Sequence, residues 1–250
     1  MQRKQETKAK RKIGIKIFPN GKAFYEVMEP YIDFVEIMAG EGAEYTWLQK
    51  RTKPIIIHHE HDGFGVNHAN PEKKKKNLAA TNWAIYLANK FNAEKIIVHA
   101  GHIESKECSL KEVIAQLEPI WDKRIIFENL ITVANGHYMF CYNKKDLQLL
   151  TKTFKTGICL DLSHAIISGI EMHKNPEYFL KELQALPILH GHVCDGHLET
   201  PIDQHIHIGD GNFPLKEYFK YIPKNRDITV ETPKNIEKAK KDIAFLRKYG

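Results

Sequence analysis

Three potential metal ligands stand close together in the stretch PIDQHIHIGDGNFP, residues 201–214. Asp203, His205 and His207 occupy alternate positions, and alternate side chains of an extended segment point to the same side. Imidazole and carboxylate groups together are typical ligands of zinc and other transition metals. A polar loop that is merely rich in histidine is the plain alternative, so the rest of the chain must decide.

Further histidines and carboxylates follow short apolar, β-branched runs of the sequence. They are His58, His59 and His61, then His99, Glu128, Asp161, His164, His190, His192 and Glu231. A single histidine at the end of a strand, such as His99, is more often a hydrogen-bonded core residue than a metal ligand. Glu128 and Glu231 are harder to explain that way, because a carboxylate after IIF or ITV is buried and needs a partner or a metal.

The charge of this set indicates the chemistry. A cluster of four carboxylates and five of these histidines is best neutralised by divalent cations, and three such ions would leave room for a phosphate anion. The pattern therefore points to metal-assisted phosphoester chemistry more than to sugar chemistry.

The elements that must position these residues alternate between strands and helices. Eight strands are expected, at 12–18, 34–38, 54–59, 95–101, 124–129, 157–164, 188–194 and 227–231. Helical patterns lie between or after them, at 77–91, 109–121, 144–154, 175–186 and 235–250. This order predicts a closed (β/α)8 TIM barrel, with an open doubly wound sheet as the alternative. In a barrel, side chains at the carboxyl ends of the strands converge on one mouth.

Length and composition fit one barrel domain over residues 13–250. The chain has 250 residues, 42% of them hydrophobic, and a net charge of +6. Residues 1–12 hold six basic side chains and one glutamate, which indicates a basic, disordered tail. No apolar run is long enough for a membrane span, and four cysteines without a C-x-x-C pair suit a reducing cytoplasm.

Seven segments in order resemble the endonuclease IV family, the abasic-site endonucleases of the xylose-isomerase-like barrel superfamily. They are HDGFGVN (61–67), VHAG (98–101), FEN (127–129), CLDLSHAIISG (159–169), HVCD (192–195), DQHIHIGDGN (203–212) and ETP (231–233). The resemblance implies a monomer that hydrolyses the phosphodiester 5′ to an abasic site in double-stranded DNA, in base excision repair.

The same resemblance implies three zinc ions, with Mn²⁺ as an alternative at some sites. The first would be held by His61, His99 and Glu128, the second by Glu128, Asp161, His192 and Glu231, and the third by His164, Asp203 and His205. Glu128 and Glu231 would also move protons in catalysis. His207 falls outside this ligand pattern and is expected to be structural.

Some assignments stay open or depart from the family. His59 competes with His61, and His190 with His192, although HDGFGVN and HVCD favour the second of each pair. Phe64 stands where the family has a tyrosine that enters DNA, so a stacking role is expected for it.

Three segments depart from the family: 14–21 lacks its histidine and paired glycines, 38–47 lacks its polar DNA-contacting pattern, and 129–136 reads NLITVANG where a threonine, alanine and glycine usually follow E-N. Lys73 and Lys74 are candidate phosphate contacts, with a solvated helix face as the plain alternative.

Three rival functions remain at this stage. A sugar isomerase or epimerase of the same superfamily would use one metal on Glu128, Asp161, His192 and Glu231. The other rivals are a metal-stabilised binding protein without turnover and an ultraviolet-damage endonuclease.

Overall fold

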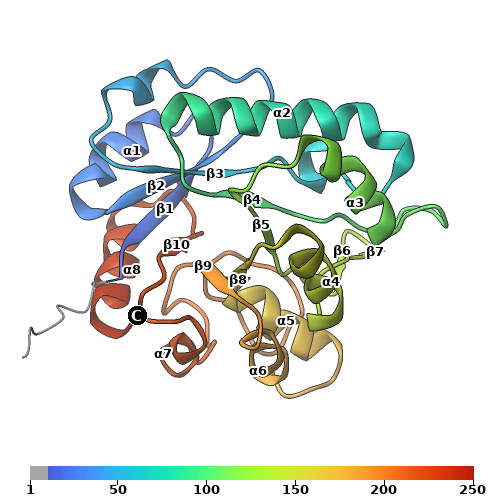
Figure 1. The fold of residues 1–250 in the computed structure, drawn as a ribbon. Helices are drawn as coiled ribbons and strands as arrows, with labels where there is room; N and C mark the ends of the chain where they lie inside the picture. Colours follow the sequence, from blue (N-terminus) through green and yellow to red (C-terminus); the bar gives the residue numbers. More distant parts are fainter. Residues whose placement is uncertain (1–10) are drawn as a thin grey trace, which may run out of the picture.

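Eight parallel strands close into a barrel in the computed structural model, which describes residues 11–250 (Figure 1). The strands are β1 Ile13–Ile17, β2 Phe34–Met38, β3 Ile55–His58, β4 Ile96–Val98, β5 Ile125–Glu128, β8 Ile158–Asp161, β9 Ile188–Val193 and β10 Ile228–Val230. Their order around the barrel is β1-β10-β9-β8-β5-β4-β3-β2. The predicted TIM barrel is confirmed, and the open sheet is excluded because β1 pairs with both β2 and β10.

Helices follow the strands and cover the outside of the barrel. They are α1 Lys22–Met28, α2 Lys74–Phe91, α3 Leu110–Leu117, α4 Lys144–Phe154, α5 Leu162–Glu171, α6 Tyr178–Leu183, α7 Leu215–Tyr218 and α8 Ile236–Tyr249. Short 3₁₀ segments lie at Glu29–Tyr31, Thr46–Lys50, Asp62–Phe64, Pro71–Lys73, Glu118–Ile120 and Phe219–Tyr221. All five predicted helices are present, whereas α1, α5 and α7 were not predicted.

The boundary between β8 and α5 differs from the sequence prediction. The strand expected to reach His164 ends at Asp161, and helix α5 begins at Leu162. Asp161 caps this helix, because one of its carboxylate oxygens accepts the backbone N–H of His164 at 2.8 Å. His164 therefore lies in the first turn of a helix and not on the strand.

Side chains divide the core into two clusters. The larger one fills the space between the barrel and its helices, with alternate strand residues such as Ile15, Val35 and Ile57. The smaller one consists of Phe34, Ile56, Ile97, Ile126 and Cys159, which occupy the opposite, inward positions of five neighbouring strands. These residues close the floor of the barrel, so the next inward position along each strand faces the mouth.

Two segments lie outside the regular βα pattern. A hairpin of β6 Val133–Ala134 and β7 His137–Tyr138 projects beside the barrel after β5 (Figure 1).

Of the expected tail at 1–12, residues 1–10 lie outside the described part of the chain. Arg11 is buried and donates to the carbonyl oxygen of Ile222 at 2.7 Å. Within residues 11–250, no helix is long and apolar enough to cross a membrane.

Candidate metal centre

Glu128, at the end of β5, lies in the middle of the polar side chains above the barrel floor. One of its oxygens, Oε2, is 3.2 Å from His58 Nε2 and 3.1 Å from His99 Nε2. The other, Oε1, is 3.2 Å from His164 Nδ1 and 3.4 Å from His192 Nδ1. Glu128 is fully buried, and its two oxygens face different imidazoles, those of His58 and His99 on one side and those of His164 and His192 on the other.

His192 and Glu231 lie on the Oε1 side of Glu128. His192 Nδ1 is 2.8 Å from Glu231 Oε1, and its Nε2 is 3.0 Å from Glu36 Oε2 on β2. Asp161 also lies near Glu128. One of its carboxylate oxygens accepts the hydrogen bond that caps helix α5, while Oδ2 has no hydrogen-bond partner among the described residues. His192 and Glu231 thus lie next to each other and His192 next to Glu128, whereas Asp161 is grouped with Glu128 and His164.

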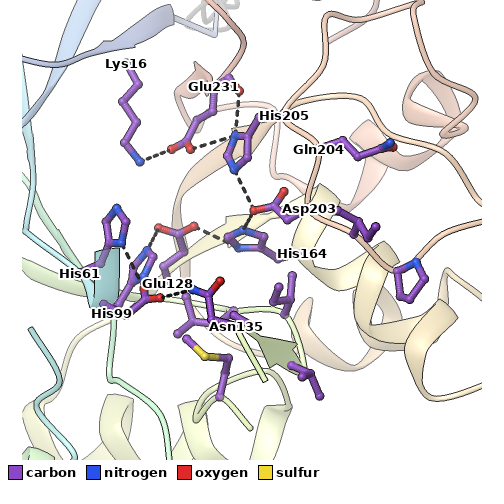
Figure 2. Close-up of a pocket in the computed structure, with 18 of the residues that line it drawn as sticks. Lys16, His61, His99, Glu128, Asn135, His164, Asp203, Gln204, His205 and Glu231 are labelled. Carbon is purple, nitrogen blue, oxygen red and sulfur yellow. Dashed lines mark hydrogen bonds and ion pairs between the residues drawn. The ribbon is translucent and has the colours of Figure 1, made fainter. Parts of the chain in front are cut away.

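His164, Asp203 and His205 form a third group at the mouth (Figure 2). His164 Nε2 and His205 Nε2 both face Asp203 Oδ2, at 3.3 and 2.8 Å. Their Nδ1 atoms lie 2.9 Å from the carbonyl oxygens of Asn129 and Glu231, to which Nδ1–H can donate. Such a bond leaves the Nε2 lone pair free, which is the usual state of a histidine that binds a metal. The expected third ligand set is thus brought together.

The expectation that His207 shares a face with Asp203 and His205 is wrong. His205 has a φ of 47°, a left-handed conformation that interrupts the extended backbone and ends the alternation of side chains. His207 turns away from the centre, and its Nδ1 lies 2.6 Å from Asp242 on α8. It therefore joins the loop to the last helix.

Strand β3 brings a different histidine to the centre from those weighed in the sequence. His59 points outward, and its Nε2 is 3.0 Å from the hydroxyl of Thr81 on α2. His61 lies beyond the strand, stacked on His99 with ring centroids 5.1 Å apart, and its Nδ1 is 3.1 Å from Asp62. His58, which was named but not considered as a ligand, faces Glu128 from inside the barrel.

His190 and His192 both point into the barrel, at different depths. His190 Nε2 is 2.8 Å from the hydroxyl of Thr229 and its ring packs edge-on against Phe34 in the floor. His192 is one inward position closer to the mouth and faces Glu231. Of the two, His192 is therefore the one that contacts the carboxylate of Glu231.

Two charged residues of the centre were missed in the sequence. Lys16 on β1 places its ammonium 3.0 Å from Glu231 Oε1. Glu36 on β2 accepts from the Thr229 hydroxyl at 2.6 Å and faces His192. Each stands mid-strand at an inward position between buried neighbours. A charged side chain in an apolar strand was therefore the available signal.

The residues expected to contact DNA lie in the segment that follows β3 and at the start of α2. Phe64 is 37% exposed and meets the His61 ring edge-on, with centroids 5.1 Å apart. Lys73 donates to Glu104 at 2.5 Å, whereas Lys74 is exposed at the start of α2. Phe64 thus contacts a residue that lines the cavity, Lys74 is exposed, and the charge of Lys73 is partly compensated by Glu104.

A cavity of about 700 Å³ opens above the metal-ligand groups (Figure 2). Its polar wall includes Lys16, His99, Glu128, His164 and Glu231. Its rim combines residues of the β6–β7 hairpin segment with residues 201–205. The hairpin tip is joined to the loop after β3, because Asn135 donates to Asp62 at 3.4 Å.

The electrostatics of the centre fit a bound cation. Burial opposes ionisation of Glu128, but the neighbouring His192 and His99 hold the pKa of its carboxyl well below the usual range. Burial also opposes protonation of His164, yet Asp161 and Asp203 raise its pKa well above the usual value.

Burial and the ammonium of Lys16 instead lower the pKa of His58 to about 4. Buried oxygens of Glu128, Asp161 and Asp203 lack hydrogen-bond partners among residues 11–250, so mixed imidazole and carboxylate donors are available to divalent ions.

Comparisons with known proteins agree with this architecture. A family model described as xylose isomerase-like TIM barrel matches residues 28–249. The probable endonuclease 4 of Persephonella marina is 23% identical over 230 residues, covering 81% of this chain and 79% of that protein. The probable endonuclease 4 of Trichlorobacter lovleyi is 27% identical over 213 residues, covering 75% of each.

Solved structures of two kinds share the fold. Endonuclease IV from Thermus thermophilus superposes with a TM-score of 0.73 at 19% identity, covering 95% of this chain and 98% of that one. A D-tagatose 3-epimerase-like protein superposes with a TM-score of 0.74 at 23% identity, covering 95% and 96%. Fold similarity alone therefore does not choose between nuclease and epimerase chemistry.

Proposed function

The chain belongs to the xylose isomerase-like TIM barrel family, and we propose that it is a metal-dependent endonuclease that cuts DNA 5′ to an abasic site. The observation that carries this proposal is the position of Glu128 between groups of imidazoles, with His164, Asp203 and His205 forming a further group beside it. A single-metal sugar enzyme has no use for that third group as ligands. The sequence similarity to probable endonucleases 4 supports the same choice.

The proposed ligands are the nine residues expected from the sequence: His61, His99, Glu128, Asp161, His164, His192, Asp203, His205 and Glu231. Three zinc ions, with Mn²⁺ as an alternative at some sites, would supply Lewis-acid stabilisation of the phosphate and an acidified water. Glu128 and Glu231 serve first as ligands and second as proton carriers, because both carboxylates border the cavity.

The cavity is proposed to receive the abasic nucleotide. An abasic residue can leave the duplex at low cost because it has no base to unstack. Lys16 lines the cavity, and its ammonium, 3.0 Å from Glu231, can also attract the phosphate that would enter with the sugar. Phe64 is exposed at the mouth, where its ring can stack on a base next to the lesion, and Lys74 can contact a neighbouring phosphate.

The direct test is cleavage of a duplex that carries one tetrahydrofuran abasic-site analogue. Metal-loaded protein should release a fragment with a 3′-hydroxyl end, and chelation with EDTA should stop the reaction. The same duplex without the analogue is the control. Absence of cleavage by protein with a full metal content would contradict the proposal.

An epimerase is the second candidate, because the similar D-tagatose 3-epimerase-like structure has the same fold and the cavity can accommodate a small sugar. Nuclear magnetic resonance spectra of ketohexoses incubated with the metal-loaded protein test this alternative. Conversion of a sugar without any DNA cleavage would favour it.

A further inference from the structure

His58 reaches the proposed metal centre from inside the barrel. It is the last residue of β3 and is fully buried, directly above the floor residue Ile56 on the same strand. Its Nε2 lies 3.2 Å from Glu128 Oε2, and His99 Nε2 lies 3.1 Å from the same oxygen. Three potential ligand atoms from three adjacent strands thus converge at one place.

Both ring nitrogens of His58 face oxygen atoms. Nδ1 is 2.9 Å from the carbonyl oxygen of His59, and Nε2 faces the Glu128 carboxylate. A neutral imidazole has only one N–H, so one nitrogen must present a lone pair to an oxygen. The Nδ1–H tautomer satisfies the carbonyl and leaves the Nε2 lone pair facing Glu128. A cation between these two acceptors resolves the conflict.

The same arrangement occurs twice in the third ligand group. His164 and His205 also place Nδ1 near a backbone carbonyl oxygen and direct Nε2 at a carboxylate oxygen. A carbonyl that fixes the proton on one ring nitrogen orients the other for a metal. His58 therefore has the orientation of a ligand and not that of a core histidine such as His59.

We propose that His58 is a metal ligand, which together with His99 and Glu128 holds a divalent ion on the interior side of the centre. The proposal rests on the proposed metal-dependent function and adds a residue that the family's ligand pattern does not include. It also gives this ion an imidazole-rich set, which favours zinc over the harder Mn²⁺. His61 keeps its place among the proposed ligands on the mouth side, next to His99 and Asp62, where it lines the cavity.

The test compares two buried histidines of neighbouring positions. His58→Leu removes the proposed ligand, and His59→Leu is the control, because His59 is equally buried but faces Thr81 outside the barrel. Zinc content is measured by elemental analysis, and zinc affinity by competition with a chromophoric chelator. His58→Leu should weaken one zinc site by more than the roughly 10–100-fold seen when an outer hydrogen-bond partner is lost. His59→Leu should bind zinc like the parent.

A second measurement uses the unmodified protein, so it does not depend on the variant folding. Long-range ¹H–¹⁵N spectra of the histidine rings, recorded during zinc titration, should show a large shift of His58 Nε2 while Nδ1 stays protonated. Unchanged His58 signals at zinc saturation, or parent-like zinc binding by folded His58→Leu, would overturn the proposal. Both measurements are made without DNA. If the protein binds zinc through His58 but does not cut at an abasic site, the proposed endonuclease function is refuted and the proposed role of His58 as a ligand is not.

Discussion

Lys16 offers a quantitative test of the charge balance in the centre. Its ammonium lies 3.0 Å from Glu231, and the two side chains are only 11% and 4% exposed. Lys16→Met keeps much of the side-chain length and removes the charge, which leaves Glu231 without its cation. Breaking a buried pair in this way costs about 3–5 kcal/mol. At about 2–4 °C per kcal/mol for a chain of this size, even a loss of 3 kcal/mol lowers Tm by roughly 6–12 °C.

The loss should depend on metal, because a divalent ion at Glu231 replaces the missing charge. Unfolding is therefore measured in EDTA and again with saturating zinc, and the destabilisation should be much smaller with zinc. Lys95→Met is the control: its ion pair with Asp227 is 18% and 25% exposed, so its removal should cost less than about 1 kcal/mol in either buffer. An equal loss for Lys16→Met with and without zinc would refute the reasoning.

Three further outcomes are expected. Phe64→Ala should weaken binding to an abasic-site duplex by roughly 5- to 150-fold, from about 1–3 kcal/mol of lost stacking, while elemental analysis finds unchanged metal content. The double change Asp203→Ala and His205→Ala should remove one metal per chain and most cleavage, with parent-like circular dichroism; parent-like metal and cleavage would contradict the third site. Burial tends to raise the pKa of the Glu104 carboxyl, but hydrogen bonds, first of all the one from Lys73, lower it to about 2. The ionised carboxylate therefore stabilises the fold above pH 4.5, and this contribution is lost as the pH falls from 4.5 to 2. Glu104→Gln should therefore flatten the acid side of the urea-midpoint profile, and an unchanged slope would exclude this group as its source.

The barrel could be predicted because its strands are short β-branched runs with clear ends. The ligand candidates were visible for the same reason, since Glu128 and Glu231 follow runs that must be buried. Glu36 carried a similar signal in the middle of FVEIM, where a charge has no solvent to face. His58 was harder to recognise, because the run HHEH does not show which side chain turns inward until the end of the strand is known.

Other features depend on backbone geometry that the residue pattern did not show. The left-handed φ of His205 removed His207 from the predicted face, and nothing in the alternation of residues reveals it. The hairpin after β5 did have a signal: Asn135 and Gly136, at φ 51° and 79°, form the Asn-Gly turn typical of two-residue hairpins. The first three residues of helix α5 were predicted as the end of β8, because the residue pattern did not show that Asp161 caps a helix.

The double role of Asp161 would link the filling of the two neighbouring metal positions that we propose. One carboxylate oxygen holds the N-terminus of α5 and so fixes His164, while the other faces the group around Glu128. An ion bound by that second oxygen would immobilise the carboxylate of Asp161. It would thereby also immobilise the first turn of α5, which carries His164, a proposed ligand of the neighbouring metal position. Occupancy of one proposed position would thus preorganise the other, and metal uptake by this pair should follow a cooperative isotherm with no long-lived half-filled state.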